Sequence, residues 1–179
     1  MKIVALGDSI TEGFPYTLYD SWVHYTAKTL NLEIINQGIC GNMTVEMLHR
    51  FARHVAAHEP THVIILGGGN DAAMDLPLED YAENIRGMVK LSEQYHICPI
   101  LALPILSLDP AEEFWQSSYR DWLRAYAQQE DILTLDFYTP FLIAQQEDRV
   151  RPLFSDWVHP SQAGYRLMGE TAVEFFRSC

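Results

Sequence analysis

Residues 2–13 read KIVALGDSITEG, a short apolar run that leads directly into a polar segment. An apolar run of about five residues that is rich in Ile and Val and ends at Gly is typical of a buried strand followed by a tight turn. The turn presents Ser9. Because an isolated serine hydroxyl is a poor nucleophile, chemistry at Ser9 requires a base, a group that orients the base, and donors for an oxyanion.

The rest of the chain alternates short apolar runs with segments of helical periodicity. After the first strand, further strands are expected at 32–36, 62–66, 97–103 and 132–136. Helices are expected at 20–31, 44–55, 77–91, 114–126 and 161–176, with a short helical piece at 140–146. The segment 67–76 is glycine-rich at its start and is expected to be a loop.

Five strands that alternate with helices predict an α/β fold with a parallel sheet covered on both faces. We expect one domain that spans residues 1–179 and forms a three-layer α/β/α sandwich; in the flavodoxin-like form of this sandwich the strand order is 2-1-3-4-5. In this order the carboxyl ends of the first three strands are neighbours. Ser9, Gly38 and Asn70, which follow these strands, should therefore lie side by side at one edge of the sheet.

The composition excludes several classes of function. The formal net charge of -12, from 24 acidic and 12 basic residues, disfavours binding to nucleic acid or to anionic membranes. The longest apolar stretch, 97–106, contains two prolines and is too short to span a membrane, and no signal peptide is recognised, so we expect a cytoplasmic protein. Three cysteines without CxxC spacing indicate neither a metal site nor a disulfide framework, and no cofactor is expected.

A candidate base and its orienting carboxylate occur together near the C-terminus. His159 follows Asp156 by three residues in SDWVHP, between an irregular segment and the last helix. A turn with this spacing can bring the carboxylate to one ring nitrogen while the other nitrogen points toward a hydroxyl. A solvated Asp beside a His that caps a helix is the common alternative for this spacing alone.

Candidate oxyanion donors come from the ends of the first three strands. The backbone N–H at Ser9, the N–H of Gly38 and the side-chain amide of Asn70 would form a three-donor cradle. Glycine suits such a place because it has no side chain to exclude a substrate oxygen. Taken singly, Gly38 is more simply explained as a turn residue, and Asn70 as a loop residue that bonds its own backbone.

These motifs together resemble the blocks of the SGNH or GDSL hydrolase family. The matching segments are Gly7-Asp8-Ser9-Ile10, with Ile in place of the usual Leu, then Asn36-Gln37-Gly38, Gly69-Asn70-Asp71, Asp156 to His159, and Gly164-Tyr165. The resemblance implies a serine ester hydrolase in which Ser9 is the nucleophile, His159 the base and Asp156 its orienter. It also implies that Ser9, Gly38 and Asn70 form the oxyanion hole.

Other functions remain open at this point. A non-catalytic flavodoxin-like domain that binds a ligand such as flavin would have the same architecture. Gly67, Gly69 and Ala72 match a dinucleotide fingerprint, but the expected helix begins too late for it. His54 and His58 are one helical turn apart and could bind a metal, although no third ligand is evident. The G-x-S-x-G elbow of the other large serine esterase fold is absent.

The expected substrate is a small neutral ester with a short to medium acyl chain. The residues expected at the pocket rim are mostly apolar or aromatic: Phe14, Tyr16, 72–76, Leu106, Phe114, Trp115, Phe154 and Trp157. Because aromatic rims also stack on sugars, an acetylated carbohydrate is the alternative substrate. No macromolecular partner is indicated, and the sequence is compatible with a homo-oligomer. Asp8 is expected to fix the turn by accepting hydrogen bonds from nearby backbone N–H groups.

Overall fold

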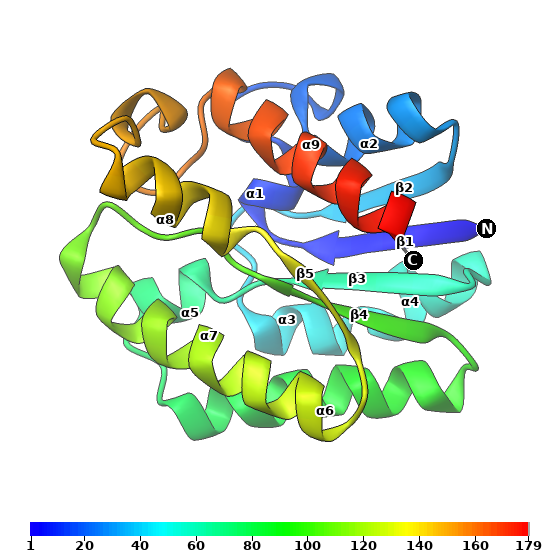
Figure 1. Ribbon diagram of the computed structural model, residues 1–179. Coiled ribbons are helices and arrows are strands. Elements are labelled where there is room, and N and C mark those ends of the chain that lie inside the picture. Colours follow the sequence, from blue (N-terminus) through cyan, green and yellow to red (C-terminus); the bar gives the residue numbers. More distant parts are fainter. Residues whose placement is uncertain (179) are drawn as a thin grey trace.

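The computed structural model describes residues 1–178 and contains one parallel sheet with the strand order β2-β1-β3-β4-β5 (Figure 1). The strands are β1 (Lys2–Gly7), β2 (Glu33–Gly38), β3 (His62–Leu66), β4 (Cys98–Leu103) and β5 (Leu133–Asp136). The predicted strand order and fold class are confirmed. All five carboxyl ends point to the same edge of the sheet, which lies at the left in Figure 1.

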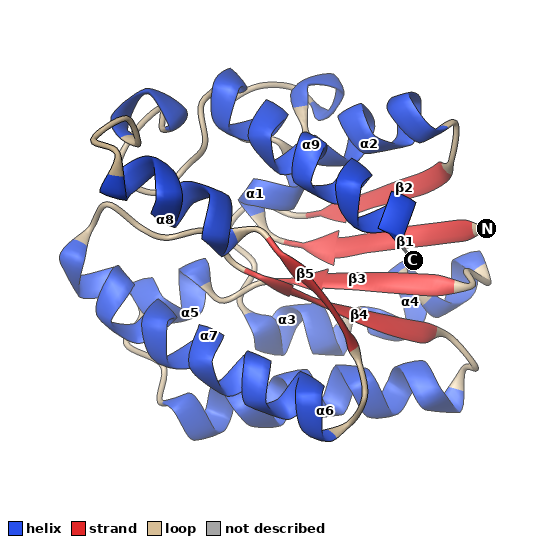
Figure 2. Ribbon diagram, viewed as in Figure 1, coloured by secondary structure: helices blue, strands red, loops and turns tan. Residues whose placement is uncertain are grey.

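Helices cover both faces of the sheet and form a three-layer sandwich (Figure 2). One layer contains α2 (Trp22–Leu30), α8 (Tyr138–Gln146) and α9 (Gln162–Ser178), and the other contains α3 (Thr44–His49), α4 (Phe51–His54), α6 (Leu78–Gln94) and α7 (Pro110–Gln129). Two short helices, α1 (Ser9–Glu12) and α5 (Gly69–Ala73), lie at the carboxyl edge of the sheet. The single-turn 3-10 helices are η1 (Leu18–Asp20), η2 (Ala56–His58) and η3 (Arg151–Leu153).

Strand residues alternate between two apolar cores, one on each face of the sheet. In β1, Val4 and Leu6 pack with the α3, α6 and α7 side, whereas Ile3 and Ala5 pack with the α2 and α9 side. The same alternation holds along β3 and β4. Because successive side chains of a strand point to opposite faces, a strand buried on both faces must be apolar throughout, as these short runs are.

The structure corrects several of the predicted element boundaries. Ser9 begins a short helix directly after β1, and α5 likewise begins soon after β3, where a loop was expected up to residue 76. β2 continues through Gly38 rather than ending at residue 36. The helix expected over 44–55 divides at Arg50, whose backbone φ and ψ of -93° and 2° are not helical.

Among residues 1–178, no helix is both long and apolar enough to cross a membrane.

Candidate active site

Ser9 lies at the carboxyl end of β1 as the first residue of α1. Asp8 caps this helix, because its Oδ1 accepts a hydrogen bond of 2.9 Å from the Ile10 N–H. At the other end of the helix, Gly13 adopts a φ of 111°, a conformation that favours glycine. These two ends fix the direction of α1 and thereby the position of the Ser9 side chain, which is 5% exposed. The predicted role of Asp8 in fixing the turn agrees with this cap.

His159 joins Ser9 to Asp156 in a continuous line of hydrogen bonds. The distance from Ser9 Oγ to His159 Nε2 is 3.1 Å, and that from His159 Nδ1 to Asp156 Oδ2 is 2.8 Å. With Nδ1–H donating to the carboxylate, a neutral imidazole has its free lone pair on Nε2, which faces the serine hydroxyl. The arrangement is therefore that of a hydroxyl, a base and a carboxylate that orients the base.

Asp156 is held by its own loop as well as by the ring. Its Oδ1 accepts from the N–H groups of Val158 and His159, at 2.8 and 2.7 Å. Partial burial alone would raise the pKa of Asp156, but these backbone donors and the His159 ring outweigh that effect and lower it. Asp156 is thus maintained as an anion that accepts from Nδ1–H.

The neighbouring carboxyl of Asp8 has the opposite tendency. Asp8 is 3% exposed, and burial raises its pKa to about 6, although the Ile10 N–H and the nearby His159 both act to lower it. Asp71, another buried acid, adds repulsion and accepts hydrogen bonds from the backbone and hydroxyl of Thr44. Two carboxyls thus lie near the His159 ring in different environments, and they differ in the pH at which they ionise.

Asn70 lies in the first turn of α5 and faces the same pocket as Ser9 and His159. Its side-chain Nδ2 donates a hydrogen bond of 2.9 Å to the backbone carbonyl of Asn42. An amide nitrogen has two N–H groups, so this bond fixes the plane of the amide and leaves the second N–H available to a ligand. The structure therefore brings Ser9, His159 and Asp156 together, and the Asn70 amide lies at the same pocket in the position of a donor.

Gly38 requires a correction. Its N–H donates to Asn36 Oδ1 at 2.9 Å, so it is not free to bind an oxyanion. A Cβ at this position would lie 2.1 Å from the Glu12 backbone nitrogen. Gly38 is glycine because α1 packs directly on the end of β2.

The neighbouring loop of residues 39–43 contains a different candidate donor. The N–H groups of residues 39, 40, 42 and 43 all have acceptors, namely Gly7 O, the Glu12 carboxylate, Ile39 O and the Glu46 carboxylate. Among the described residues the N–H of Gly41 has no such acceptor, and its φ of 80° again favours glycine. Sequence analysis missed Gly41 because two glycines in one short loop gave no means of telling which N–H is already paired.

The pocket beside Ser9 has a volume of about 210 Å³. Its lining residues are Asp8, Ser9, Ile10, Gly69, Asn70, Ala73, Ile105, Leu106, Glu112, Gln116, Val158 and His159. Ala73 and Leu106 were predicted at the rim, but Phe154 is instead 4% exposed and belongs to the core beneath α8 and α9. Glu112 and Gln116, on α7, were not predicted and make one wall of the pocket polar.

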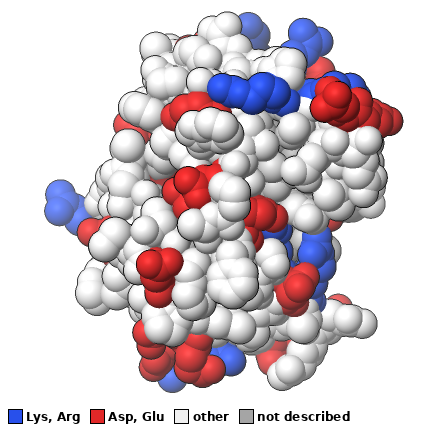
Figure 3. All heavy atoms as spheres, turned by 90° about the vertical axis from the view of Figure 1, so that its left-hand side faces the viewer, with Lys and Arg blue, Asp and Glu red and all other residues white. Residues whose placement is uncertain are grey.

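The face that contains this pocket is weakly populated with basic side chains. Figure 3 shows the carboxyl edge of the sheet: acidic side chains are spread across the middle of the face, and the basic ones lie mainly toward its margins. Aromatic side chains are exposed as well. Phe14 is 41% exposed, and its ring contacts the His159 ring edge-on, with the ring centres 4.7 Å apart. Neutral or cationic ligands therefore meet less repulsion at this face than anions do.

Comparison with known proteins shows the family of this chain. Residues 5–167 match the model of the GDSL-like Lipase/Acylhydrolase family, which covers most of the chain. The chain belongs to this family.

Relatives of this GDSL-like protein include several esterases. A solved structure from the lipolytic G-D-S-L family of Desulfitobacterium hafniense DCB-2 superposes with a TM-score of 0.88 and 36% identity over 97% of this chain and 98% of that one. The isoamyl acetate-hydrolyzing esterase of Saccharomyces cerevisiae is 29% identical over 97% of this chain and 84% of its own. The acetylxylan esterase of Geobacillus stearothermophilus is 26% identical over 99% and 96%, respectively. The lipoprotein YqeF of Bacillus subtilis, of uncharacterized function, is 29% identical over 79% and 72%.

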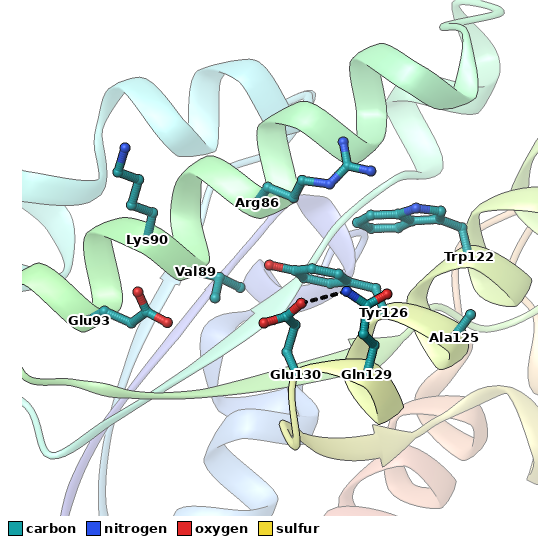
Figure 4. A pocket seen from close by; sticks show the side chains of 9 residues that line it. All are labelled: Arg86, Val89, Lys90, Glu93, Trp122, Ala125, Tyr126, Gln129 and Glu130. Carbon is teal, nitrogen blue, oxygen red and sulfur yellow. Dashed lines mark hydrogen bonds between the residues drawn. The ribbon is translucent and has the colours of Figure 1, made fainter.

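A larger hollow of about 470 Å³ lies between α6 and α7 of this GDSL-like protein, and neither Ser9 nor His159 lines it (Figure 4). Trp122 and Tyr126 stack there with ring centres 4.8 Å apart, and Arg86 lies over the Trp122 ring. It contains neither a serine nor a histidine. The smaller pocket at Ser9 is therefore the candidate active site, although it is not the largest hollow.

The histidine pair considered as a metal site is instead bridged by a glutamine side chain. Gln37 Oε1 lies 2.8 Å from His54 Nδ1, and Gln37 Nε2 lies 3.1 Å from His58 Nε2. Within residues 1–178, no group of three or more His, Cys, Asp or Glu side chains is arranged to hold a metal ion.

Proposed function

We propose that this protein is a serine carboxylic ester hydrolase that acts through an acyl-enzyme on Ser9. The observation that carries the proposal is the line from Ser9 Oγ through His159 to Asp156, with distances of 3.1 and 2.8 Å, at the wall of a small pocket. Membership of an esterase and acylhydrolase family supports the same reaction class.

In the first half of the reaction the Ser9 hydroxyl oxygen attacks the ester carbonyl carbon. His159 Nε2 accepts the hydroxyl proton as the new C–O bond forms, and Asp156 stabilises the resulting imidazolium. The tetrahedral intermediate then collapses, the bond to the alcohol oxygen breaks, and His159 returns the proton to the leaving alcohol. The acyl group remains on Ser9 as an ester.

In the second half a water molecule takes the place of the alcohol. His159 Nε2 accepts a proton from the water as its oxygen attacks the acyl carbon, and the proton passes to Ser9 Oγ when the acyl bond breaks. The products are a carboxylic acid and the free enzyme. No step requires a cofactor or a metal ion.

Three N–H groups are proposed to stabilise the oxyanion of both tetrahedral intermediates. Ser9 begins α1, so its own backbone N–H has no acceptor within that helix. The second N–H of the Asn70 amide and the unpaired N–H of Gly41 complete the set. Gly41 replaces Gly38 in this proposal, because the Gly38 N–H already donates to Asn36.

The proposed substrates are neutral esters with short acyl chains. A pocket of about 210 Å³, with Asp8 and Glu112 in its wall, suits a small acyl group better than a long or anionic one. Two relatives have names that specify acetyl esters, one of a small alcohol and one of a polysaccharide. Acetylated carbohydrate is therefore the second candidate, because exposed aromatic side chains such as Phe114 and Trp157 could stack on sugar rings.

The test is hydrolysis of 4-nitrophenyl acetate by the wild type and by Ser9→Ala. We expect Ser9→Ala to lower kcat by a factor of about 10⁴ or more without changing the fold, as checked by circular dichroism. Ser118→Ala, which removes a hydroxyl from α7 outside the pocket, is the control and should keep wild-type activity. Equal activity of Ser9→Ala and wild type would refute the nucleophile, and an inactive wild type on all esters would favour a non-catalytic ligand-binding domain.

Two further properties predicted from the sequence stay predictions. These are a cytoplasmic location and the capacity to form a homo-oligomer.

A further inference from the structure

Arg50 lies at the junction of α3 and α4, behind the wall of the active site, and its guanidinium connects two strand ends. Nη2 donates to the backbone carbonyl of Gly7 at 2.8 Å and to that of Gln37 at 2.9 Å. Gly7 ends β1 two residues before Ser9, and Gln37 is in the neighbouring strand β2. One side chain thus holds together the two strand ends from which the nucleophile and the loop 39–43 emerge.

The same guanidinium also holds the loop that supports Asn70. Arg50 Nε donates to the side-chain Oδ1 of Asn42 at 2.7 Å. The backbone carbonyl of Asn42 in turn accepts the 2.9 Å hydrogen bond from Asn70 Nδ2. Arg50 is therefore two hydrogen bonds away from the amide proposed to bind the oxyanion, and Asn42 is the intermediate.

Gly41, the other proposed donor of this loop, precedes Asn42 directly. Its backbone conformation depends on the loop geometry, which is maintained by Arg50 at Asn42 and by Glu12 at Cys40. The three proposed donors are thus connected to one guanidinium: the Ser9 N–H through Gly7, Gly41 through the loop, and Asn70 through Asn42.

We propose that Arg50 is a positioning residue for the oxyanion hole, which fixes Asn70 relative to Ser9 through its hydrogen bonds to Gly7, Gln37 and Asn42. This inference rests on the proposed esterase reaction. Oxyanion donors are effective only when they are held at the place where charge develops, so a small displacement of the amide reduces stabilisation of the transition state. Loss of Arg50 should therefore lower kcat more than it raises KM.

A lysine at position 50 is the informative substitution. It keeps the positive charge, but a single ammonium on a flexible stem cannot reproduce the planar fork of donors with which Arg50 contacts three acceptors. Arg53 is the matched control, because it is an exposed arginine on α4 only three residues away and has no bond to the site. We expect Arg50→Lys to lower kcat by about 10- to 100-fold, which is less than the roughly 10²- to 10³-fold for a removed oxyanion donor, because the amide is displaced and not removed. Arg53→Lys should be indistinguishable from wild type.

A double-mutant cycle separates positioning from simple structural support. In the wild-type background, Asn70→Ala should lower kcat by about 10²- to 10³-fold. In the Arg50→Lys background the same change should cost less than about 10-fold, because the amide is already displaced. In the Arg53→Lys background it should cost the full amount. An Asn70→Ala factor that is equal in all three backgrounds would overturn the inference and leave the esterase reaction intact.

A measurement that does not depend on activity keeps the inference testable if the wild type hydrolyses no ester. The side-chain amide resonances of Asn70 can be assigned in ¹⁵N NMR spectra by their loss in Asn70→Ala. We expect these resonances to shift or broaden in Arg50→Lys and to stay unchanged in Arg53→Lys. Unchanged Asn70 resonances in a folded Arg50→Lys protein would contradict the positioning role.

Discussion

Asp156 is placed to orient His159, the proposed base, without taking part in proton transfer. Both of its oxygens are engaged, one by two backbone N–H groups and the other by His159 Nδ1. Because the pKa of Asp156 is lowered, its carboxyl stays ionised at a lower pH than an ordinary aspartate does. Its contribution to catalysis is therefore expected to be the choice of tautomer and the orientation of the ring.

The substitution Asp156→Asn tests this role. The asparagine keeps the size of the side chain, but its neutral amide stabilises the imidazolium less and can favour the wrong tautomer. We expect kcat for 4-nitrophenyl acetate to fall by about 10²- to 10⁴-fold, which is less than for Ser9→Ala. A loss as large as that of Ser9→Ala, measured in the same assay, would indicate that Asp156 does more than orient His159.

Asp8 is a second carboxyl beside the proposed nucleophile, and its ionisation should destabilise the fold. Its pKa is raised from an ordinary 3.8 to about 6 in the folded protein, mainly by burial. Between these two values the folded state binds more protons than the unfolded state, so stability falls as the pH rises through this window. Above about pH 6 the full cost, up to about 3 kcal/mol for a shift of this size, is present.

Asp8→Asn is predicted to remove that cost while it keeps the helix cap, because Asn caps a helix as well as Asp does. Chemical unfolding of both proteins at pH 4 and pH 7.5 measures the effect. Relative to wild type, the variant should be more stable at pH 7.5 than at pH 4, so the difference in the free energy of unfolding between variant and wild type should increase with pH. A difference that is the same at both pH values would show that Asp8 titrates alike in the folded and unfolded states.

At the scale of elements, the contact between α1 and β2 sets the geometry around the nucleophile. The absence of a side chain at Gly38 allows the backbone of Glu12 to approach the strand directly. Glu12 then reaches over to accept from the Cys40 N–H and so joins α1 to the loop 39–43. The position of Ser9 and the shape of this loop are coupled through one close contact.

Alanine substitutions at Gly38 and Gly41 are predicted to differ in their effect on stability. Gly38→Ala would place a methyl group 2.1 Å from the Glu12 nitrogen, so α1 must move. Gly41→Ala meets open space and has only the strain of its positive φ, about 1–2 kcal/mol. We expect a much larger drop in melting temperature, measured by calorimetry, for Gly38→Ala. Equal drops for the two variants would contradict the close packing of α1 on β2.

The parts of the site that depend on local sequence could be predicted, and those that depend on packing could not. Asp156 and His159 share one short loop, so their spacing, taken together with the other motifs of the chain, predicted their pairing. The pairing of the Gly38 N–H was not visible, because it depends on how the Asn36 side chain folds back. Glu112 and Gln116 were missed because helical periodicity does not distinguish a polar residue that faces a pocket from one that faces solvent.

The fold itself was largely predictable because each strand is a compact apolar run between glycine or polar segments. The alternation of strands and helices predicted a parallel sheet covered on both faces. The strand order 2-1-3-4-5, which the structure has, was taken from the flavodoxin-like form of this fold. The short helices α1 and α5 were not anticipated, since helices of four and five residues leave almost no periodic signal. Phe154 was assigned to the rim because burial of a loop residue depends on its tertiary neighbours, here Phe141 of α8.

For the whole molecule, the size of the pocket predicts the preference for acyl chain length. The pocket of about 210 Å³ leaves little room for a long acyl chain. We expect kcat/KM to fall from 4-nitrophenyl acetate through butyrate to octanoate, by about tenfold or more overall. A maximum at octanoate would contradict a small acyl pocket, and a clear preference for acetylated xylo-oligosaccharides over the aryl acetate would favour the carbohydrate alternative.

The central claim is that Ser9 forms the covalent intermediate, and covalent labelling tests it most directly. A 4-nitrophenyl alkylphosphonate with a short alkyl group should phosphonylate Ser9, with the 4-nitrophenolate as leaving group. Intact-mass spectrometry should show one adduct per chain in the wild type, the adduct should map to Ser9 by peptide sequencing, and its formation should parallel the loss of esterase activity. Ser9→Ala should not be labelled. Labelling of Ser9→Ala at the wild-type rate, or full esterase activity in a wild-type protein that carries the adduct on Ser9, would contradict the account.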